Sequence, residues 1–339
     1  MRARSTARAD GLDKVRALQR VLYRSAKQQP NRRFHALFDK VARGDILWWA
    51  WDEVRANRGA PGADGVTIQQ VEASGVASFL QELAAALKAG TYRPAPLRRV
   101  HIPKPGQPGK TRPLGIPCVR DRVAMTAAKL VLEPVFEADF LPSSFGFRPK
   151  RSAHQALEAI RVEANRGAEW VLDADVRDCF GSIDHDALLV QLARRVSDRR
   201  MLKLLRGWLR VGVLEDGVTT VTGAGTPQGS PISPLLANVA LHVLDQAWAQ
   251  GGRSLGVLVR YCDDFVILCR TRQRAEQARR LVAEILATLG CTCTPTRPGS
   301  CACPGAGRDS TSSASTTTRW SRGGGEAATT CNDGQPTER

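Results

Sequence analysis

Tyr261-Cys262-Asp263-Asp264 is the stretch that decides the fold of this chain. It lies between two apolar runs, Leu255 to Val259 and Phe265 to Leu268. Two such runs joined by a short polar step predict a β-hairpin that holds two carboxylates at its tip. Adjacent carboxylates are costly unless a positive charge lies between them, and a divalent metal ion is the usual partner. Taken alone, this pair is more often a solvated turn, so the rest of the sequence has to decide.

A second acidic strand end lies upstream of this hairpin. Trp170 to Val176 has the apolar character of a short buried strand, and it carries Asp173 and Asp175 on one face because side chains alternate along a strand. Pairing of this strand with the hairpin would bring Asp175 close to Asp263. Taken alone, Asp175 is explained equally well as the acid at a strand end or a helix cap.

The composition points to a polyanionic partner. The chain has 339 residues, enough for about two domains, and a formal net charge of +16. A protein this basic most often meets nucleic acid. Residues 1–29 form a basic N-terminal extension, and for its first ten residues a solvated, frayed helix is the simpler explanation. No apolar run is long enough to cross a membrane, and no signal-peptide core is visible. Nine cysteines without an export signal predict free thiols in the cytoplasm.

Hydrophobic periodicity predicts an α+β fold, with helices on one face of a sheet. The helices are expected at 12–28, 34–54, 66–90, 119–138, 152–166, 232–250 and 272–289. The strands are expected at 92–100, 170–176 and 218–229 and in the hairpin, with a Pro/Gly-rich loop at 102–117.

The composition changes at Gly290. Residues 291–339 contain no Leu, Ile, Val, Phe or Met and are rich in Thr, Ser, Gly and Pro. Such a segment cannot bury enough apolar surface to offset its ordering entropy, so we expect a disordered tail over 291–339. Two Cys-x-Cys pairs, at 291–293 and 301–303, could suggest a zinc site, but their spacing is unusual and no histidine lies nearby.

Five ordered blocks resemble the reverse transcriptase encoded by group II introns, of the maturase type, between about Arg33 and Leu289. The blocks are Asn57-Arg58-Gly59 through Asp64-Gly65; Ile102-Pro103-Lys104 with Arg112-Pro113-Leu114-Gly115-Ile116-Pro117; Leu132-Glu133-Pro134 with Ser144-Phe145-Gly146-Phe147-Arg148-Pro149; Thr226-Pro227-Gln228-Gly229-Ser230-Pro231; and Tyr261-Cys262-Asp263-Asp264. The resemblance implies a right-hand polymerase with fingers at 30–166 and a ferredoxin-like palm at 167–290. It implies an RNA-directed DNA polymerase that uses a group II intron RNA template, a DNA primer and dNTPs.

The resemblance also implies a site. Asp175 and Asp263 would hold two Mg²⁺ ions, and Asp264 would orient or ligate them. Phe180 would abut the nucleotide sugar and exclude a 2′-hydroxyl, and Gln228 would pack beside the incoming nucleotide. Lys104 and Arg112 would bind its triphosphate. Without the resemblance, these four residues are better explained as a core phenylalanine, a turn glutamine and a solvated basic loop.

The chain departs from the family pattern in several places. Gly181 stands where the family often has Asp, Met125 where Gln is common, and Cys262 where Ala is usual. After about residue 290, the family's last palm strand, thumb and maturase domain are not readable, which suggests a truncated chain. A one-base shift can explain this, because codons compatible with residues 291–303 also encode LHLHPDKTRLVRL in the next frame; the gene sequence tests that hypothesis.

Three alternatives stay open at this point. The first is a catalytically impaired RNA-binding remnant of the intron-encoded protein, and the second is an unstable product of a broken gene. The third is another enzyme with a polymerase-type palm, such as a nucleotidyl cyclase, but that leaves the Gln228 block and the fingers blocks unexplained.

Overall fold

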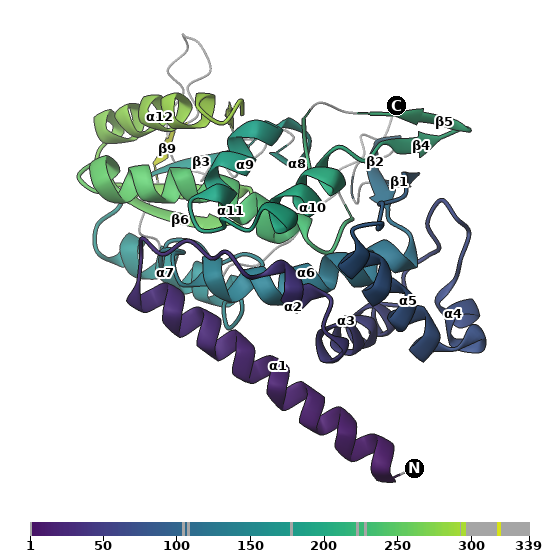
Figure 1. The fold of residues 1–339 in the computed structure, drawn as a ribbon. Coiled ribbons are helices and arrows are strands. Elements are labelled where there is room, and N and C mark those ends of the chain that lie inside the picture. The colour runs from purple at the N-terminus through teal and green to yellow at the C-terminus, as the bar shows by residue number, and fades with distance from the viewer. Residues whose placement is uncertain are drawn as a thin grey trace, which may run out of the picture.

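The computed structural model describes residues 2–103, 106, 109–176, 179–221, 224–226, 229–291, 293–295 and 317–319 (Figure 1). Its helices are α1 (Arg2–Gln28), α2 (Phe38–Val41), α3 (Gly44–Ala56), α4 (Ile68–Ser74), α5 (Val76–Ala89), α6 (Val119–Glu137), α7 (Ala153–Asn165), α8 (Cys179–Ser182), α9 (His185–Ala193), α10 (Arg199–Leu209), α11 (Ser233–Ala247) with the π-helix η1 (Trp248–Gly252), and α12 (Arg272–Ala287). Its strands are β1 (Leu97–Pro103), β2 (Thr111–Ile116), β3 (Trp170–Val176), β4 (Val213–Glu215), β5 (Val218–Thr220), β6 (Val257–Tyr261), β7 (Asp264–Cys269), β8 (Cys293–Pro295) and β9 (Thr317–Arg319).

Helix α6 is the centre of the helical half of the molecule. It is buried along most of its length and packs against α1, α2, α3 and α11. The long helix α1 crosses α6, and Gln19 Nε2 donates to Leu130 O at 3.0 Å while Lys27 Nζ donates to Ala138 O at 2.8 Å. Figure 1 shows the N-terminal part of α1 leaving the body of the molecule. The hydrogen bonds of Gln19 and Lys27 thus tie the second half of this helix to the α6 region.

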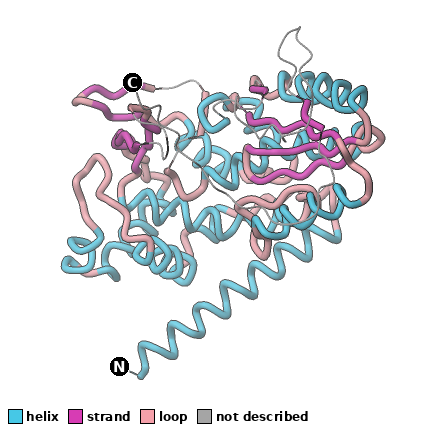
Figure 2. The backbone as a smooth tube through the Cα atoms, turned by 180° about the vertical axis from the view of Figure 1, so that it is seen from behind, coloured by secondary structure: helices cyan, strands magenta, loops and turns pink. Residues whose placement is uncertain are grey.

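The larger sheet has the order β6-β7-β3-β8, and β9 also pairs with β3. Its apolar side chains alternate between two cores. Leu172, Phe265 and Ile267 belong to the main core, whereas Val266 and Leu268 belong to a smaller one. Helix α12 packs on β3 and β7 from the main-core side, where α9 and α11 complete the layer, and α7 packs on β6 and β7 from the other side (Figures 1 and 2). The expectation of helices on one face is therefore incomplete, because α7 covers part of the second face.

Two short strands come from the segment that we expected to be disordered. β8 pairs antiparallel with the end of β3, with Val176 opposite Cys293, and β9 pairs with its start, with Trp170 opposite Arg319. The structure differs from the expectation for these two segments. They cover the edge of β3 that β7 leaves open, where unpaired backbone groups would be a liability. Their threonines suit extended backbone.

The smaller sheet has the order β2-β1-β4-β5. Strands β1 and β2 form an antiparallel hairpin in which Ile102 lies opposite Arg112, so both ends of the Pro/Gly-rich segment 102–117 belong to strands. The Pro-rich residues expected to begin a strand at Tyr92 precede β1, which starts at Leu97.

Two of the expected helices are broken. The helix expected at 34–54 divides into α2 and α3, and the helix expected at 66–90 divides into α4 and α5 at Gly75, whose φ is 104°. This left-handed conformation is accessible to glycine and ends α4. The helix expected at 12–28 ends as predicted but begins ten residues earlier, at Arg2, and the remaining expected helices lie close to their predicted bounds. Within the described residues, no helix is both long and apolar enough to cross a membrane.

Candidate active site

The hairpin predicted around the acidic tetrapeptide is present. Tyr261 lies opposite Asp264, so Cys262 and Asp263 form a two-residue loop between β6 and β7. Cys262 has a φ of 62°, a left-handed conformation that is unusual for a residue with a side chain. Tight hairpin loops of two residues commonly require such a conformation. The loop therefore presents Asp263 and Asp264 at the tip of the hairpin.

Asp175 lies directly opposite Asp264 in the antiparallel pairing of β3 and β7. Residues opposite one another in such a pair point to the same face of the sheet, with Cβ atoms about 5 Å apart. Asp263 is in the adjoining loop, where its carbonyl accepts a hydrogen bond from Val176 N at 3.4 Å. The pairing thus brings Asp175, Asp263 and Asp264 together, as the sequence predicted.

The face that carries Asp175 and Asp264 is only partly covered. Val171, Val266 and Leu268 lie on the same face nearer the other end of the strands, and they pack under α7 in the smaller core. Asp175 and Asp264 are exposed and Asp263 is half-buried. In Figure 2 this side of the sheet is turned toward the viewer. The acidic end of the sheet is therefore accessible to a substrate.

The electrostatics of Asp263 favour a cation beside it. Burial raises the pKa of the Asp263 carboxyl group, and the neighbouring Asp264 carboxylate raises it further, whereas the charges of Arg112 and Arg260 lower it. Carboxylate oxygens are the donors that Mg²⁺ prefers, so these residues fit the ion. Across the described part of the chain, no group of three or more His, Cys, Asp or Glu residues is arranged so that it could hold a metal ion by itself. Mg²⁺ tolerates this, because it keeps waters and substrate phosphates in its shell.

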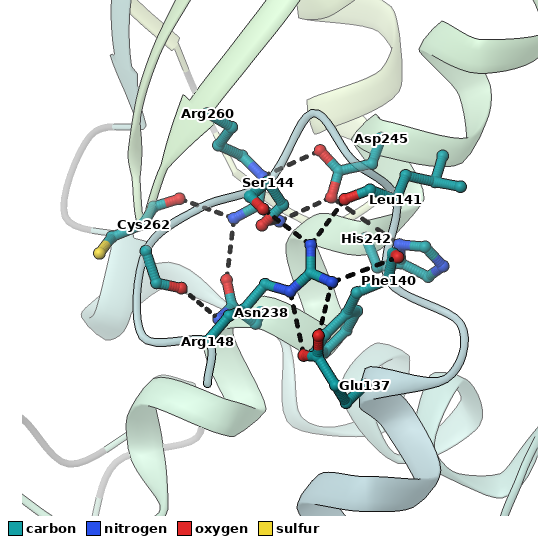
Figure 3. Close-up of polar contacts among 11 residues, drawn as sticks. Glu137, Phe140, Leu141, Ser144, Arg148, Asn238, His242, Asp245, Arg260 and Cys262 are labelled. Carbon is teal, nitrogen blue, oxygen red and sulfur yellow. Dashed lines mark hydrogen bonds and ion pairs between the residues drawn. The ribbon is translucent and has the colours of Figure 1, made fainter. Parts of the chain in front are cut away.

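A fully buried arginine supports the loop from behind. The Arg260 side chain is 0% exposed and donates five hydrogen bonds (Figure 3). Nε and Nη2 bind the two carboxylate oxygens of Asp245 at 2.9 and 2.6 Å. Nη1 binds Asn238 Oδ1 at 3.0 Å and Cys262 O at 2.8 Å, and Nη2 binds Ser144 Oγ at 2.8 Å. These contacts use every N–H donor of the guanidinium group and fix the carbonyl that precedes Asp263.

The buried Arg260–Asp245 pair stays ionised. Burial disfavours both charges, but their mutual attraction and hydrogen bonds outweigh it, so the pKa of Asp245 is lowered and that of Arg260 is raised. Asp245 comes from α11 and Arg260 from β6. The pair therefore ties the β6–β7 hairpin to helix α11.

A second buried arginine holds the loop that faces the hairpin. Arg148 binds both carboxylate oxygens of Glu137 at 3.0 and 2.7 Å, and it donates to the carbonyls of Leu141 and Ser144 at 2.6 and 2.7 Å (Figure 3). The same loop pairs with β6 through its backbone, because Arg260 N donates to Ser143 O at 2.8 Å. Residues 143–148 are consequently fixed against the β6–β7 hairpin.

Gly146 is where this loop touches the hairpin most closely. A Cβ atom built on Gly146 would lie 2.3 Å from Cys262 Sγ and 2.4 Å from Cys262 N, so only glycine fits. Its carbonyl accepts a hydrogen bond from Asn238 Nδ2 at 2.9 Å. The next residue, Phe147, is 55% exposed and has a φ of 55°. A strained and exposed aromatic residue therefore lies one position from the contact with the catalytic loop.

Phe180 and the segment 224–226 lie together beside the acidic end of β3. The half-buried Phe180 packs on the main core, and its carbonyl accepts a hydrogen bond from Thr226 N. Gly225 has a φ of 97°, and a Cβ atom there would lie 2.9 Å from Gly181 Cα. Gly181, which departs from the family pattern, thus lies where two backbone segments approach each other closely. Gln228 lies outside the described residues, but Gly229 next to it approaches Gly115 O of β2.

Arg112 is exposed on β2, and its positive charge lowers the pKa of Asp263, so the two side chains are within electrostatic reach of one another. Lys104 lies outside the described residues. Of the seven predicted site residues, the structure thus relates Asp175, Asp263, Asp264, Phe180 and Arg112 to one region.

Sequence reasoning missed Arg260, Asp245, Asn238 and Ser144. The available signals were a lone arginine in the apolar run before the acids and a lone aspartate in the apolar helix 233–247. A buried charge in such a run needs a partner, and pairing these two would have been the simplest solution.

Comparison with known proteins agrees with this geometry. Residues 102–296 match the family model described as reverse transcriptase (RNA-dependent DNA polymerase). The chain therefore belongs to the reverse transcriptase family, and its relatives place it in the group II intron-encoded type.

The relatives differ in how much of their length is matched. Protein YkfC of Escherichia coli K12 is 34% identical over 78% of each chain. The group II intron-encoded protein LtrA of Lactococcus lactis subsp. cremoris is 37% identical, over 63% of this chain and 35% of LtrA. An uncharacterized 91 kDa protein in the cob intron of Schizosaccharomyces pombe is 33% identical, over 61% of this chain and 25% of that protein. The chain thus spans about a third or less of the two intron-encoded relatives.

Proposed function

We propose that this chain is an RNA-directed DNA polymerase that extends a DNA primer along a group II intron RNA template. The 3′-hydroxyl oxygen of the primer would attack the α-phosphorus of a dNTP. A new P–O bond forms, the bond to the bridging oxygen of the β-phosphate breaks, and pyrophosphate leaves with that electron pair. The hydroxyl proton passes to solvent. The reaction needs charge stabilisation at both oxygens.

The placement of the acids carries this proposal. Asp175 and Asp264 are opposite one another on an open face, and Asp263 adjoins them in a loop fixed by Arg260. We propose that Asp175 and Asp263 hold two Mg²⁺ ions and that Asp264 orients or ligates them. When bound, the ions would activate the attacking hydroxyl and neutralise charge on the leaving group.

The remaining substrate contacts are assigned by the same proposal. Arg112 would bind the triphosphate, because its charge already acts on the acidic site and its guanidinium group fits phosphate oxygens. Phe180, close to the end of β3, would lie against the sugar and select dNTPs. Lys104 and Gln228 remain proposed as triphosphate and nucleotide contacts on the resemblance alone. In this scheme, residues 30–166 are the fingers and 167–290 the palm.

Primer extension on an RNA template with dNTPs and Mg²⁺ tests the proposal. Asp263→Asn should lower incorporation by about 100-fold or more, because metal-held charge stabilisation contributes several kcal/mol and each 1.36 kcal/mol is tenfold. Asp173→Asn is the matched control, since Asp173 lies on the same face of β3 but opposite Val266 rather than at the acidic end. Equal loss in both variants would contradict the assignment.

An RNA-binding role without chemistry is the second candidate. The net charge of +16 favours it independently of the acids. Salt-sensitive RNA binding that survives Asp263→Asn, with no incorporation by the unaltered chain, would support this candidate over the polymerase.

A further inference from the structure

Helix α10 carries a row of cations on its outer face. Arg199, Lys203, Arg206 and Arg210, the residue after its last turn, are all exposed. At 100° per residue, these four positions fall within an arc of about 60° and extend over about 16 Å of the helix axis. We refer to these four residues as the α10 stripe. The row is a regular surface feature rather than a scatter of charges.

The buried face of α10, opposite the stripe, determines that the stripe faces solvent. Met201, Leu205 and Trp208 are buried in the main core, and Trp208 Nε1 donates to Tyr92 Oη at 3.1 Å. At the start of the helix, the Asp198 carboxylate accepts hydrogen bonds from the backbone N–H groups of Arg200 and Met201 and from those of Leu37 and Phe38. The helix cannot rotate without losing these contacts, so the stripe has to face solvent.

Within the part of the chain that the structure describes, no acid neutralises the stripe. Residues 199–210 contain five Lys or Arg and no Asp or Glu, and the adjoining Asp198 is only 6% exposed, with its oxygens occupied by N–H groups. Among the described residues, none of the four stripe side chains makes an ion pair. On α12, by contrast, Arg272 pairs with Glu276 at 2.9 Å. Four aligned cations without counter-charges repel one another, so the stripe suits a polyanion.

The stripe lies away from the catalytic acids. α10 packs on α9, which belongs to the helical layer over the main-core face of the larger sheet. Asp175 and Asp264 lie on the other face of that sheet. In Figure 1, α10 is on the near side of the molecule, next to α9 and α11. A template–primer bound at the acids would therefore leave the stripe open.

We propose that the α10 stripe binds the phosphate backbone of RNA outside the catalytic cleft, as a second contact surface for the RNA that carries or surrounds the template. Arginine and lysine side chains in a row fit successive phosphates, and the stripe offers no exposed aromatic or apolar group for base readout. Binding there is independent of sequence. The proposal rests on the proposed function only in that the partner is RNA.

The test measures the salt dependence of RNA binding by the full chain. The α10 variant is Arg199→Gln, Lys203→Gln, Arg206→Gln and Arg210→Gln combined. Its matched control is Arg272→Gln, Arg274→Gln, Arg279→Gln and Arg280→Gln on α12, which removes the same charge from another exposed helix. Glutamine has almost the same helix propensity as arginine and lysine, so both variants should fold. Binding of a long, structured RNA is followed by fluorescence anisotropy between about 50 and 300 mM salt.

The α10 variant should reduce the slope of log K against log salt by about 3, because each lost phosphate contact removes about 0.7 to 0.9. The α12 control should change it by less than 1. Lys203→Gln with Arg206→Gln alone should remove about half of the effect. Extension of a short template–primer should stay close to that of the unaltered chain.

An unchanged slope in the α10 variant would overturn the proposal, and so would an equal change in the α12 control, which would mean that net charge alone matters. If the α10 variant shows the slope change but the unaltered chain extends no primer, the RNA-binding surface is supported and the proposed polymerase function is not. The two conclusions are therefore separable.

Discussion

Arg260 and Asp245 form a bidentate ion pair in which both side chains are fully buried, with N–O distances of 2.9 and 2.6 Å. The pair joins the strand that leads into the catalytic loop to helix α11, and through Ser144 it also reaches the loop that precedes Arg148. Three segments that are distant in sequence are thus held around one guanidinium group.

Removing one member of this pair should be costly. Arg260→Met leaves the Asp245 carboxylate buried without a partner, so we expect a loss of about 3–5 kcal/mol in the free energy of unfolding. Combining Arg260→Met with Asp245→Leu should recover part of that loss, because no uncompensated charge remains. Urea denaturation of the two single variants and the double variant measures this. A double variant as unstable as the sum of the singles would contradict the coupling.

Gly146→Ala should abolish correct folding of the catalytic loop. The added methyl group would lie 2.3 Å from Cys262 Sγ and 2.4 Å from Cys262 N. Cys262→Ala removes only the first of these two clashes, so we expect no rescue in the double variant. Thermal unfolding and primer extension of Gly146→Ala, Cys262→Ala and the double variant test this. Recovery in the double variant would show that the clash with Cys262 Sγ alone causes the defect of Gly146→Ala.

Phe147→Gly should stabilise the chain. A bulky residue with a φ of 55° stores about 1–3 kcal/mol of strain, which glycine relieves at an entropic cost of about 0.5–1 kcal/mol. Because the ring is largely exposed, little burial is lost. We expect a net gain of about 1 kcal/mol in the free energy of unfolding. Phe147→Ala is the control, since it removes the ring but keeps the Cβ atom, and it should show no gain.

Asp198 should make stability depend on pH in the acid range. Burial raises the pKa of its carboxyl group, but the four backbone N–H donors outweigh burial, so the folded-state pKa lies below its ordinary value. Its contribution is therefore complete above the unfolded-state pKa of about 3.9 and is lost as the pH falls through the lower folded-state value.

Asp198→Asn removes that titration. Its urea midpoint should be lower than that of the unaltered chain at pH 6, and the difference should shrink as the pH falls below about 4. Asp186→Asn, an exposed acid near the start of α9, is the control and should leave the pH profile unchanged. A difference that is constant with pH would mean that the lost hydrogen-bond geometry, rather than the charge, is responsible.

Much of the site could be predicted from the sequence because each of its elements is determined by a short, continuous stretch of residues. The acidic tetrapeptide between apolar runs defined the hairpin, and the alternation in 170–176 defined β3. Asp184, an aspartate of the kind that favours helix starts, accepts a hydrogen bond from Ala187 N at the start of α9. The α+β class followed from the order of these elements.

The remaining features depend on contacts between distant segments. Nothing in the local sequence shows that β8 and β9 reach the open edge of β3, because strand pairing depends on which edge is left uncovered. The break between α4 and α5 could not be predicted, because it depends on the positive φ that Gly75 adopts in the folded chain. The Arg260 network joins residues from α11, β6 and the loop before Arg148, and its partners are chosen by the packing of these elements rather than by spacing.

The saturation of Arg260 has a consequence for how the site distinguishes its ligands. Arg260 is adjacent in sequence to the acidic tetrapeptide, yet all five of its donors are occupied. A phosphate ligand could therefore recruit it only by displacing Asp245, Asn238, Ser144 or the Cys262 carbonyl. Its charge still lowers the pKa of Asp263, but its hydrogen bonds are withheld from the substrate. Arg112, in contrast, is exposed on the smaller sheet, and its charge also lowers the pKa of Asp263. One arginine thus acts on Asp263 from a buried, fully hydrogen-bonded position, and the other acts on it from an exposed one.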